Sequence, residues 1–184
     1  MNSTETTATA EEREKKLAEG LAKLYRDPWL THRVLFAHRH TEASAPAHHG
    51  IVADLHAPDP RRQIEGFRGI AKTTLAEEAV LIRCLFRRHR NFVFVGPSYG
   101  RACDRLDVIK AECINNEVIA NLFGPMKEEG QRWQEGRIVL SNGCCIQALG
   151  RDQSTLGIKY QDIRPDGFLI DDVEDPNEKR TDPE

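Results

Sequence analysis

The sequence lacks any long apolar run, and this absence excludes several classes of protein. None of its 184 residues belongs to a stretch approaching the roughly 18 consecutive apolar residues that a membrane-spanning helix needs. The N-terminus, MNSTETTATAEEREKK, has no apolar segment of the kind that a secretory signal requires. With only five cysteines and no such signal, we expect reduced thiols rather than a disulfide framework. The chain is therefore predicted to be a cytosolic globular protein without a membrane partner.

The charge of the chain is distributed unevenly, although its formal net value is only −3. Residues 61–110 contain eleven Lys and Arg against five Asp and Glu, whereas residues 162–184 contain nine acidic residues against three basic ones. This pattern predicts a site for anions beside a site for cations, and the alternative is a pair of solvated surfaces of opposite sign. The length and the 39% of hydrophobic residues indicate one domain with a modest core.

Apolar periodicity predicts helices that alternate with short strands. The helices are expected at 10–26, 32–37, 48–55, 72–88 and 101–115, and the strands at 62–65, 91–95, 137–140, 145–149 and 168–170. Asn142-Gly143 predicts a hairpin between the third and fourth of these strands. We therefore expect an α/β fold with a mainly parallel sheet, a hairpin at one edge and N-terminal helices.

A phosphate-binding loop is the most informative feature of the sequence. Residues 66–73 match G-x-x-x-x-G-K-[ST], except that Ala71 replaces the second Gly. Backbone N–H groups in such a turn bind phosphate, the Lys72 ammonium reaches the β- and γ-phosphates, and the Thr73 hydroxyl coordinates Mg²⁺. Arg68 adds a cation that is able to meet the γ-phosphate. The expected nucleotide-binding residues are Gly66, Phe67, Arg68, Gly69, Ile70, Ala71, Lys72, Thr73 and Thr74. The alternative is a glycine-containing turn that only starts a helix.

A second acidic element follows about a hundred residues later. The apolar segment 168–170 ends in Asp171-Asp172, with Glu174 close behind. This is the pattern of a Walker B strand, in which one Asp binds Mg²⁺ and a neighbouring carboxylate activates water. We assign the metal to Asp171 and leave the base open between Asp172 and Glu174. The alternative is an ordinary strand end, but the two elements together predict a site for ATP and Mg²⁺.

Four of the seven histidines lie close together in the sequence, at positions 38, 40, 48 and 49. No cysteine or carboxylate stands at the usual zinc-ligand spacing from them. We therefore interpret this segment as the surface of a loop rather than as a metal site.

Several segments together resemble the large, motor subunit of the tailed-phage DNA-packaging terminases. RGIAKTTL (68–75) resembles the Arg-containing phosphate loop of that family, and FVFVGPS (92–98) its second strand. WQEGRIVLSNG (133–143) with ALGR (148–151) resembles the hairpin before its Walker B strand. RPDGFLIDDVED (164–175) is the most specific match, because RPD and DDVED occur together. The similarity covers about residues 45–180.

The resemblance implies an ATP hydrolase that drives double-stranded DNA into a procapsid. The fold would be an ASCE-type P-loop NTPase, a three-layer sandwich over 45–184 that is incomplete at its C-terminus, behind a disordered and helical lead-in over 1–44. The implied partners are double-stranded DNA, the portal protein and the small terminase subunit, in a homo-oligomeric ring in the cytoplasm of the bacterial host. Arg101, Arg105 and Arg151 are candidates for an arginine that acts on a neighbouring subunit. We expect the chain to be a fragment, since the family's nuclease domain has no room here.

Two alternatives remain open at the level of sequence. One is a P-loop ATPase of the helicase or recombination class, which uses the same two elements. The other is a catalytically inactive binding module derived from a terminase, which docks on a portal or another partner.

Overall fold

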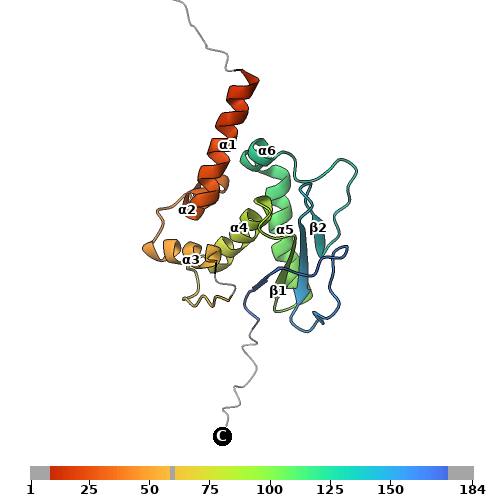
Figure 1. Cartoon of the computed structure of the whole chain (residues 1–184). Coiled ribbons are helices and arrows are strands. Elements are labelled where there is room, and N and C mark those ends of the chain that lie inside the picture. Colours follow the sequence, from red (N-terminus) through yellow and green to blue (C-terminus); the bar gives the residue numbers. More distant parts are fainter. Residues whose placement is uncertain (1–8, 59–60, 174–184) are drawn as a thin grey trace, which may run out of the picture.

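A four-stranded open sheet forms one side of the protein (Figure 1). The computed structural model describes residues 9–58 and 61–173. The strands lie in the order β2-β3-β1-β4. β1 pairs in parallel with both β3 and β4, and β2 pairs antiparallel with β3. Their bounds are Asn91–Gly96 for β1, Arg137–Val139 for β2, Cys145–Gly150 for β3 and Gly167–Ile170 for β4. An α/β fold with a mostly parallel sheet is thus confirmed.

The antiparallel pair β2–β3 is the hairpin that Asn142-Gly143 predicts. Gly143 has φ +85°, a left-handed conformation that glycine adopts readily. The Asn142 side chain accepts a hydrogen bond from the Cys144 N–H and donates to the carbonyls of Cys84 and Leu85. The turn is therefore fastened both to itself and to a neighbouring helix.

Six helices are described, most of them with recognisable start signals. They are α1 Ala10–Arg26, α2 Pro28–Leu35, α3 Pro46–His56, α4 Lys72–Leu85, α5 Tyr99–Asn115 and α6 Glu117–Phe123. Thr9 and Glu12 form a capping box at α1, and the side chains of Asp27, Ser98 and Asn116 cap α2, α5 and α6. The sequence analysis missed α6 and expected α4 to extend to residue 88, whereas Arg87, with φ +54°, lies beyond its end.

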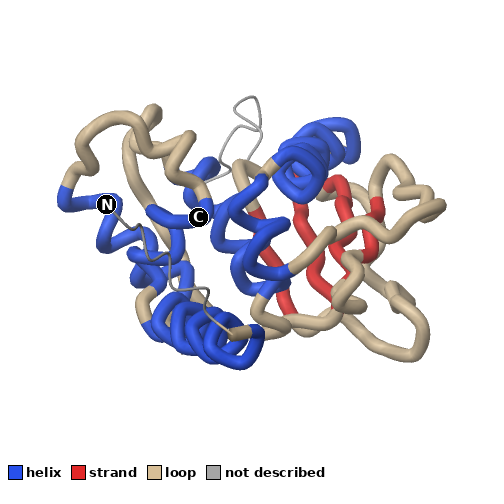
Figure 2. Tube along the Cα trace, turned by 90° about the horizontal axis from the view of Figure 1, so that it is seen from above, coloured by secondary structure: helices blue, strands red, loops and turns tan. Residues whose placement is uncertain are grey.

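The main core lies between the sheet and the helices that cover it. α5 packs against β1 and β3, and Leu106 and Ile109 of α5 are buried with Phe94 and Ile146 of those strands. Ile114, near the C-terminal end of the same helix, is 59% exposed although it is apolar. α1, α2 and α3 lie away from the sheet, and the tube view shows the strands gathered opposite them (Figure 2).

The strand expected at 62–65 does not form. Residues 61–66 carry no regular structure and approach α4 as an extended loop, with Ile64 as the sole apolar residue among 61–65. In the described part of the chain β4 pairs only with β1, so no strand stands between β4 and this polar segment. A buried parallel strand requires apolar residues on both faces, which this segment does not supply.

Among the described residues, no helix combines the length and the apolar character needed to cross a membrane.

Candidate functional site

The loop 66–71 turns sharply before α4, and two of its residues adopt left-handed backbone angles. Gly69 has φ +92° and Ala71 has φ +59°. The left-handed region costs a non-glycine residue roughly 1–2 kcal/mol, so the methyl group at position 71 imposes strain where the motif usually has glycine. Ala71 is also the N-cap of α4 and provides no side-chain acceptor there. The backbone N–H groups of the first helical turn therefore have no cap side chain to which they donate a hydrogen bond.

Lys72 folds back over this loop. Its Nζ atom donates to the carbonyl oxygen of Gly66 at 2.6 Å and to that of Phe67 at 3.1 Å. A Cβ at Gly66 would lie 3.2 Å from the Ile70 side chain and 3.5 Å from that of Lys72. The ammonium thus lies inside the turn, and the turn is closed tightly around it.

Thr73 and Asp171 meet although 98 positions separate them in the sequence. The Thr73 hydroxyl donates to Asp171 Oδ2 at 3.0 Å, and the pair is partly buried. Asp171 follows β4 directly, and its backbone N–H donates to the Val95 carbonyl of β1. A hydroxyl at the start of α4 and a carboxylate at the end of β4 therefore offer two oxygen ligands at one point.

This point lies at the carboxyl edge of the parallel strands. The register pairs Gly96 with Gly150 and Val95 with Ile170, so β1, β3 and β4 all end at the same edge. Open α/β sheets bind their ligands outside this edge. α5 also begins here, at the Ser98 cap that follows β1.

A cavity of about 350 Å³ adjoins the pair and extends between α3, α4 and β4. Lys72 and Asp171 line it together with the apolar side chains of Ile64, Phe168 and Ile170. Phe168 is 51% exposed and Ile170 is 62% exposed. The volume lies at the lower end of the range of small-molecule sites, about 300–1,000 Å³.

The other predicted residues lie around the loop without joining this contact. Arg68 is exposed, and Phe67 is 72% exposed. Ile70 and Thr74 are half-buried. Asp172, a candidate base, is exposed and has φ +51°. Glu174, the other candidate, lies outside the described residues.

The three candidate arginines have different surroundings. Arg101 is highly exposed and lies 4.0 Å from Asp104 on the same helix. Arg105 points to Glu77 of α4, with 3.4 Å between the guanidinium nitrogen and the carboxylate oxygen. Arg151 donates to the carbonyl of Val173, the residue that follows Asp171-Asp172. Arg151 thus lies close to the end of the acidic element.

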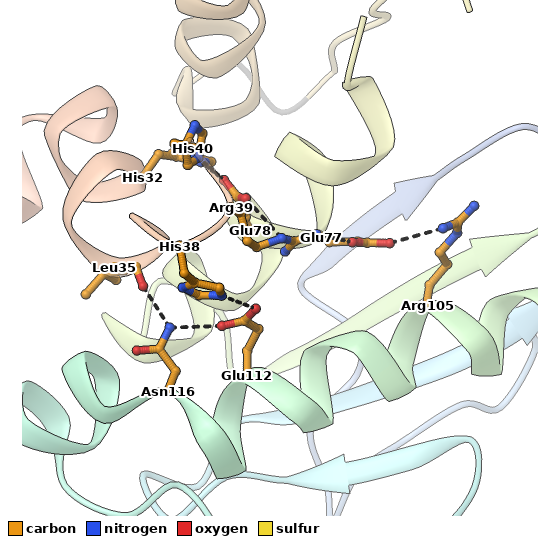
Figure 3. A network of polar contacts seen from close by, with 10 residues as sticks. All are labelled: His32, Leu35, His38, Arg39, His40, Glu77, Glu78, Arg105, Glu112 and Asn116. Atoms are coloured by element: carbon orange, nitrogen blue, oxygen red, sulfur yellow. Dashed lines mark hydrogen bonds and ion pairs between the residues drawn. The ribbon is translucent and has the colours of Figure 1, made fainter. Parts of the chain in front are cut away.

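The sequence predicted that the histidines at 38, 40, 48 and 49 lie on the surface of a loop. The structure corrects this prediction, because not all histidines of the N-terminal part lie at such a surface (Figure 3). His38 pairs at 3.0 Å with Glu112 and is largely exposed, but His40 contacts the fully buried Glu78 at 2.9 Å. His32, which the sequence analysis did not single out, also contacts Glu78, at 2.7 Å. A signal for this cluster does exist in the sequence. Glu78 comes three residues after Leu75 and four before Ile82, which places a carboxylate on the apolar face of α4.

Two neighbours of this cluster have displaced pKa values. Burial lowers the pKa of His56 to about 3, with His32, Arg83 and Arg88 acting in the same direction. Burial raises the pKa of the Glu77 carboxyl, whereas Arg39 and Arg105 oppose that rise. Arg39 lies 2.9 Å from Glu77, so a buried charge pair stands next to the histidines.

Comparisons of the chain with protein-family models, with curated proteins and with solved structures found no match.

Proposed function

We propose that this chain binds ATP with Mg²⁺ and is the ATPase motor domain of a phage terminase large subunit, which powers the packaging of double-stranded DNA. The observation that carries the nucleotide part is the hydrogen bond from Thr73 to Asp171 at 3.0 Å. It joins the two elements that the sequence identifies separately, at the carboxyl edge of a mostly parallel sheet.

The residues present fit the proposed ligand chemically. Mg²⁺ prefers oxygen ligands, and Thr73 and Asp171 present a hydroxyl and a carboxylate oxygen. Within the described part of the chain, the Lys72 ammonium is hydrogen-bonded only to two backbone carbonyls of its own loop, those of Gly66 and Phe67. A phosphate oxygen is a stronger partner for this cation than a neutral carbonyl, because both partners then carry charge.

Each residue then has a role in holding the substrate. The loop N–H groups and Lys72 bind and orient the phosphates, and the Thr73–Asp171 pair holds the metal ion. Mg²⁺, when bound, neutralises charge on the phosphates during transfer. Arg68, which is exposed beside the loop, adds positive charge near the terminal phosphate. Asp172 or Glu174 accepts a proton from the attacking water.

The packaging role rests on the terminase-like segments, above all RPDGFLIDDVED at 164–175. In this role the partners are double-stranded DNA, the portal protein, the small terminase subunit and further copies of the chain in a ring, in the bacterial host cytoplasm. The helicase or recombination class shares the nucleotide site but not these segments. ATP turnover stimulated by double-stranded DNA and portal protein would favour packaging, and portal binding without turnover would favour the inactive module.

The test of nucleotide binding is calorimetric titration with ATP and Mg²⁺. Lys72→Ala is expected to abolish saturable binding, because the variant loses the only ammonium in the loop. Lys23→Ala, which removes an exposed lysine of α1, is the matched control and should bind like the wild type. Thermal unfolding of both variants separates a lost ligand contact from a lost fold. Binding that survives Lys72→Ala would refute the proposed site.

A further inference from the structure

The buried cluster around Glu78 has the composition of a metal site. His32 Nδ1, His40 Nε2 and a Glu78 carboxylate oxygen all lie within 4.8 Å of one another. The His32 and Glu78 side chains are completely buried, and the His40 side chain is 10% exposed. The three side chains come from α2, from the segment after it and from α4, and they point toward one another in Figure 3.

We propose that His32, His40 and Glu78 bind one Zn²⁺ ion in a structural site. Two imidazole nitrogens and one carboxylate oxygen form a ligand set typical of zinc, whereas Mg²⁺ and Ca²⁺ prefer oxygen alone. Both nitrogens already face the same oxygen, Glu78 Oε2, at 2.7 and 2.9 Å. With ligand bonds of about 2.0–2.1 Å each, an ion among these atoms requires them to separate only slightly.

The carboxylate of Glu78 has unused capacity for a cation. Its Oε1 atom is buried and has no hydrogen-bond partner among the residues that the structure describes. Arg39 Nε lies 3.5 Å from this atom. Arg39 makes its shorter contact, 2.9 Å, with Glu77 instead. A buried oxygen without a hydrogen bond costs about 1–3 kcal/mol, and a metal ion bound by both oxygens of the carboxylate would compensate that cost.

His56 provides the outer contact that zinc-bound histidines usually have. Its Nε2 atom lies 3.1 Å from Nε2 of His32, on the far side of the ring from the ligand atom. A histidine that binds zinc through one nitrogen commonly donates its other N–H to an acceptor. The neutral imidazole of His56 has one acceptor nitrogen, and in the tautomer with its proton on Nδ1 this acceptor is Nε2, which faces His32.

An ion here would connect the N-terminal helices to α4. His32 lies in α2 and Glu78 in α4, so the ion would join two helices through a centre that has almost no access to solvent. This burial suits a structural site and not a catalytic one, because no substrate reaches it. The inference does not depend on the proposed ATPase function, since the cluster shares no residue with the phosphate loop or with Asp171.

The test uses the untagged full chain, stripped of metal with a chelator and titrated with Zn²⁺ in the absence of nucleotide. We expect one equivalent to bind, and an excess of Mg²⁺ should leave it in place. His40→Gln should weaken binding by more than about 100-fold, since loss of an outer partner alone already costs 10–100-fold. His48→Gln removes a histidine that is not part of the cluster and should bind like the wild type.

Co²⁺ provides a second measurement that needs no variant. Bound at this site, it should give visible d–d bands without thiolate charge-transfer bands, because all five cysteines lie elsewhere. Zn²⁺ should also raise the melting temperature of the wild type and of His48→Gln, but not that of His40→Gln. Two results of the titration would overturn the proposal: no stoichiometric binding of Zn²⁺, or binding that Mg²⁺ displaces. Binding that His40→Gln leaves unchanged, or thiolate bands in the Co²⁺ spectrum, would overturn it as well.

Discussion

Replacing His56 with Gln is expected to remove a large part of the acid sensitivity of this fold. His56 is only 9% exposed, and its Nε2 lies 3.1 Å from that of His32. Burial is the main reason that its pKa falls from 6.5 to about 3, and the electrostatic influence of His32, Arg83 and Arg88 adds to the effect. Folding therefore holds His56 in its neutral form over most of the acidic range.

The sign and the size of the effect follow from proton linkage. Below pH 6.5 the unfolded chain binds a proton at His56, whereas the folded chain does not bind it until the pH approaches about 3. The free energy of unfolding thus decreases as the pH falls through this window, by up to about 1.4 kcal/mol per pH unit. Between pH 7 and pH 5 this one group costs about 2 kcal/mol. The stabilisation is complete only above pH 6.5.

The measurement is urea-induced unfolding followed by circular dichroism at pH 7 and pH 5, with a chelator present to exclude bound metal. The glutamine amide carries both an acceptor oxygen and a donor nitrogen, so His56→Gln preserves a polar contact with His32 Nε2 while it removes the titrating group. We expect the variant to lose about 2 kcal/mol less than the wild type between the two pH values. All other titrating groups, His89 included, are common to both proteins. Equal losses in the two proteins would refute the argument that His56 is kept neutral by burial.

Three further substitutions test the site, the packing and an exposed helix. Thr73→Val preserves the shape of the side chain but removes the hydrogen bond to Asp171, so it should cost about 1 kcal/mol in urea unfolding. It should also abolish the dependence of ATP binding on Mg²⁺, and an unchanged dependence would contradict the assigned metal ligand. Gly150→Ala would place a Cβ 2.5 Å from the Tyr99 backbone nitrogen and should destabilise the fold by about 1–3 kcal/mol. Gly20→Ala in α1 meets nothing within 4 Å and should stabilise it by up to about 1 kcal/mol, so a loss of stability there would argue against the exposed helix.

Local sequence patterns predicted most of the helices and strands, because each pattern marks the face on which one element packs against the core. The apolar periodicity of α4 and α5 and the apolar run of β1 all correspond to buried surfaces. Asn142-Gly143 predicted the hairpin correctly, because a tight turn depends on only a few adjacent residues. Ile114 shows the limit of this reasoning. A residue at the edge of an apolar stripe is buried only if a neighbouring element covers it. The periodicity of one helix does not show where the neighbouring elements lie.

Long-range polar contacts were predicted only where a motif linked their members. The phosphate-loop and Walker B patterns led to Thr73 and Asp171, which do meet. No comparable pattern links His32 with Glu78, which are 46 positions apart, or His40 with the same carboxylate. The strand expected at 62–65 was wrong for a local reason, because the charged residues of this segment oppose burial in a sheet.

The two clusters are coupled by the helix that they share. Lys72 and Thr73 begin α4, and Glu78 lies six residues further on, about 9 Å along the axis at 1.5 Å per residue. Asp171 holds this helix from the side of the sheet, and His32 and His40 hold it from the side of the N-terminal helices. α4, which begins directly after the loop 66–71, is therefore supported from two directions. The N-terminal helices accordingly belong to the framework of the proposed nucleotide site, because they contact Glu78, which lies on the same helix as Lys72.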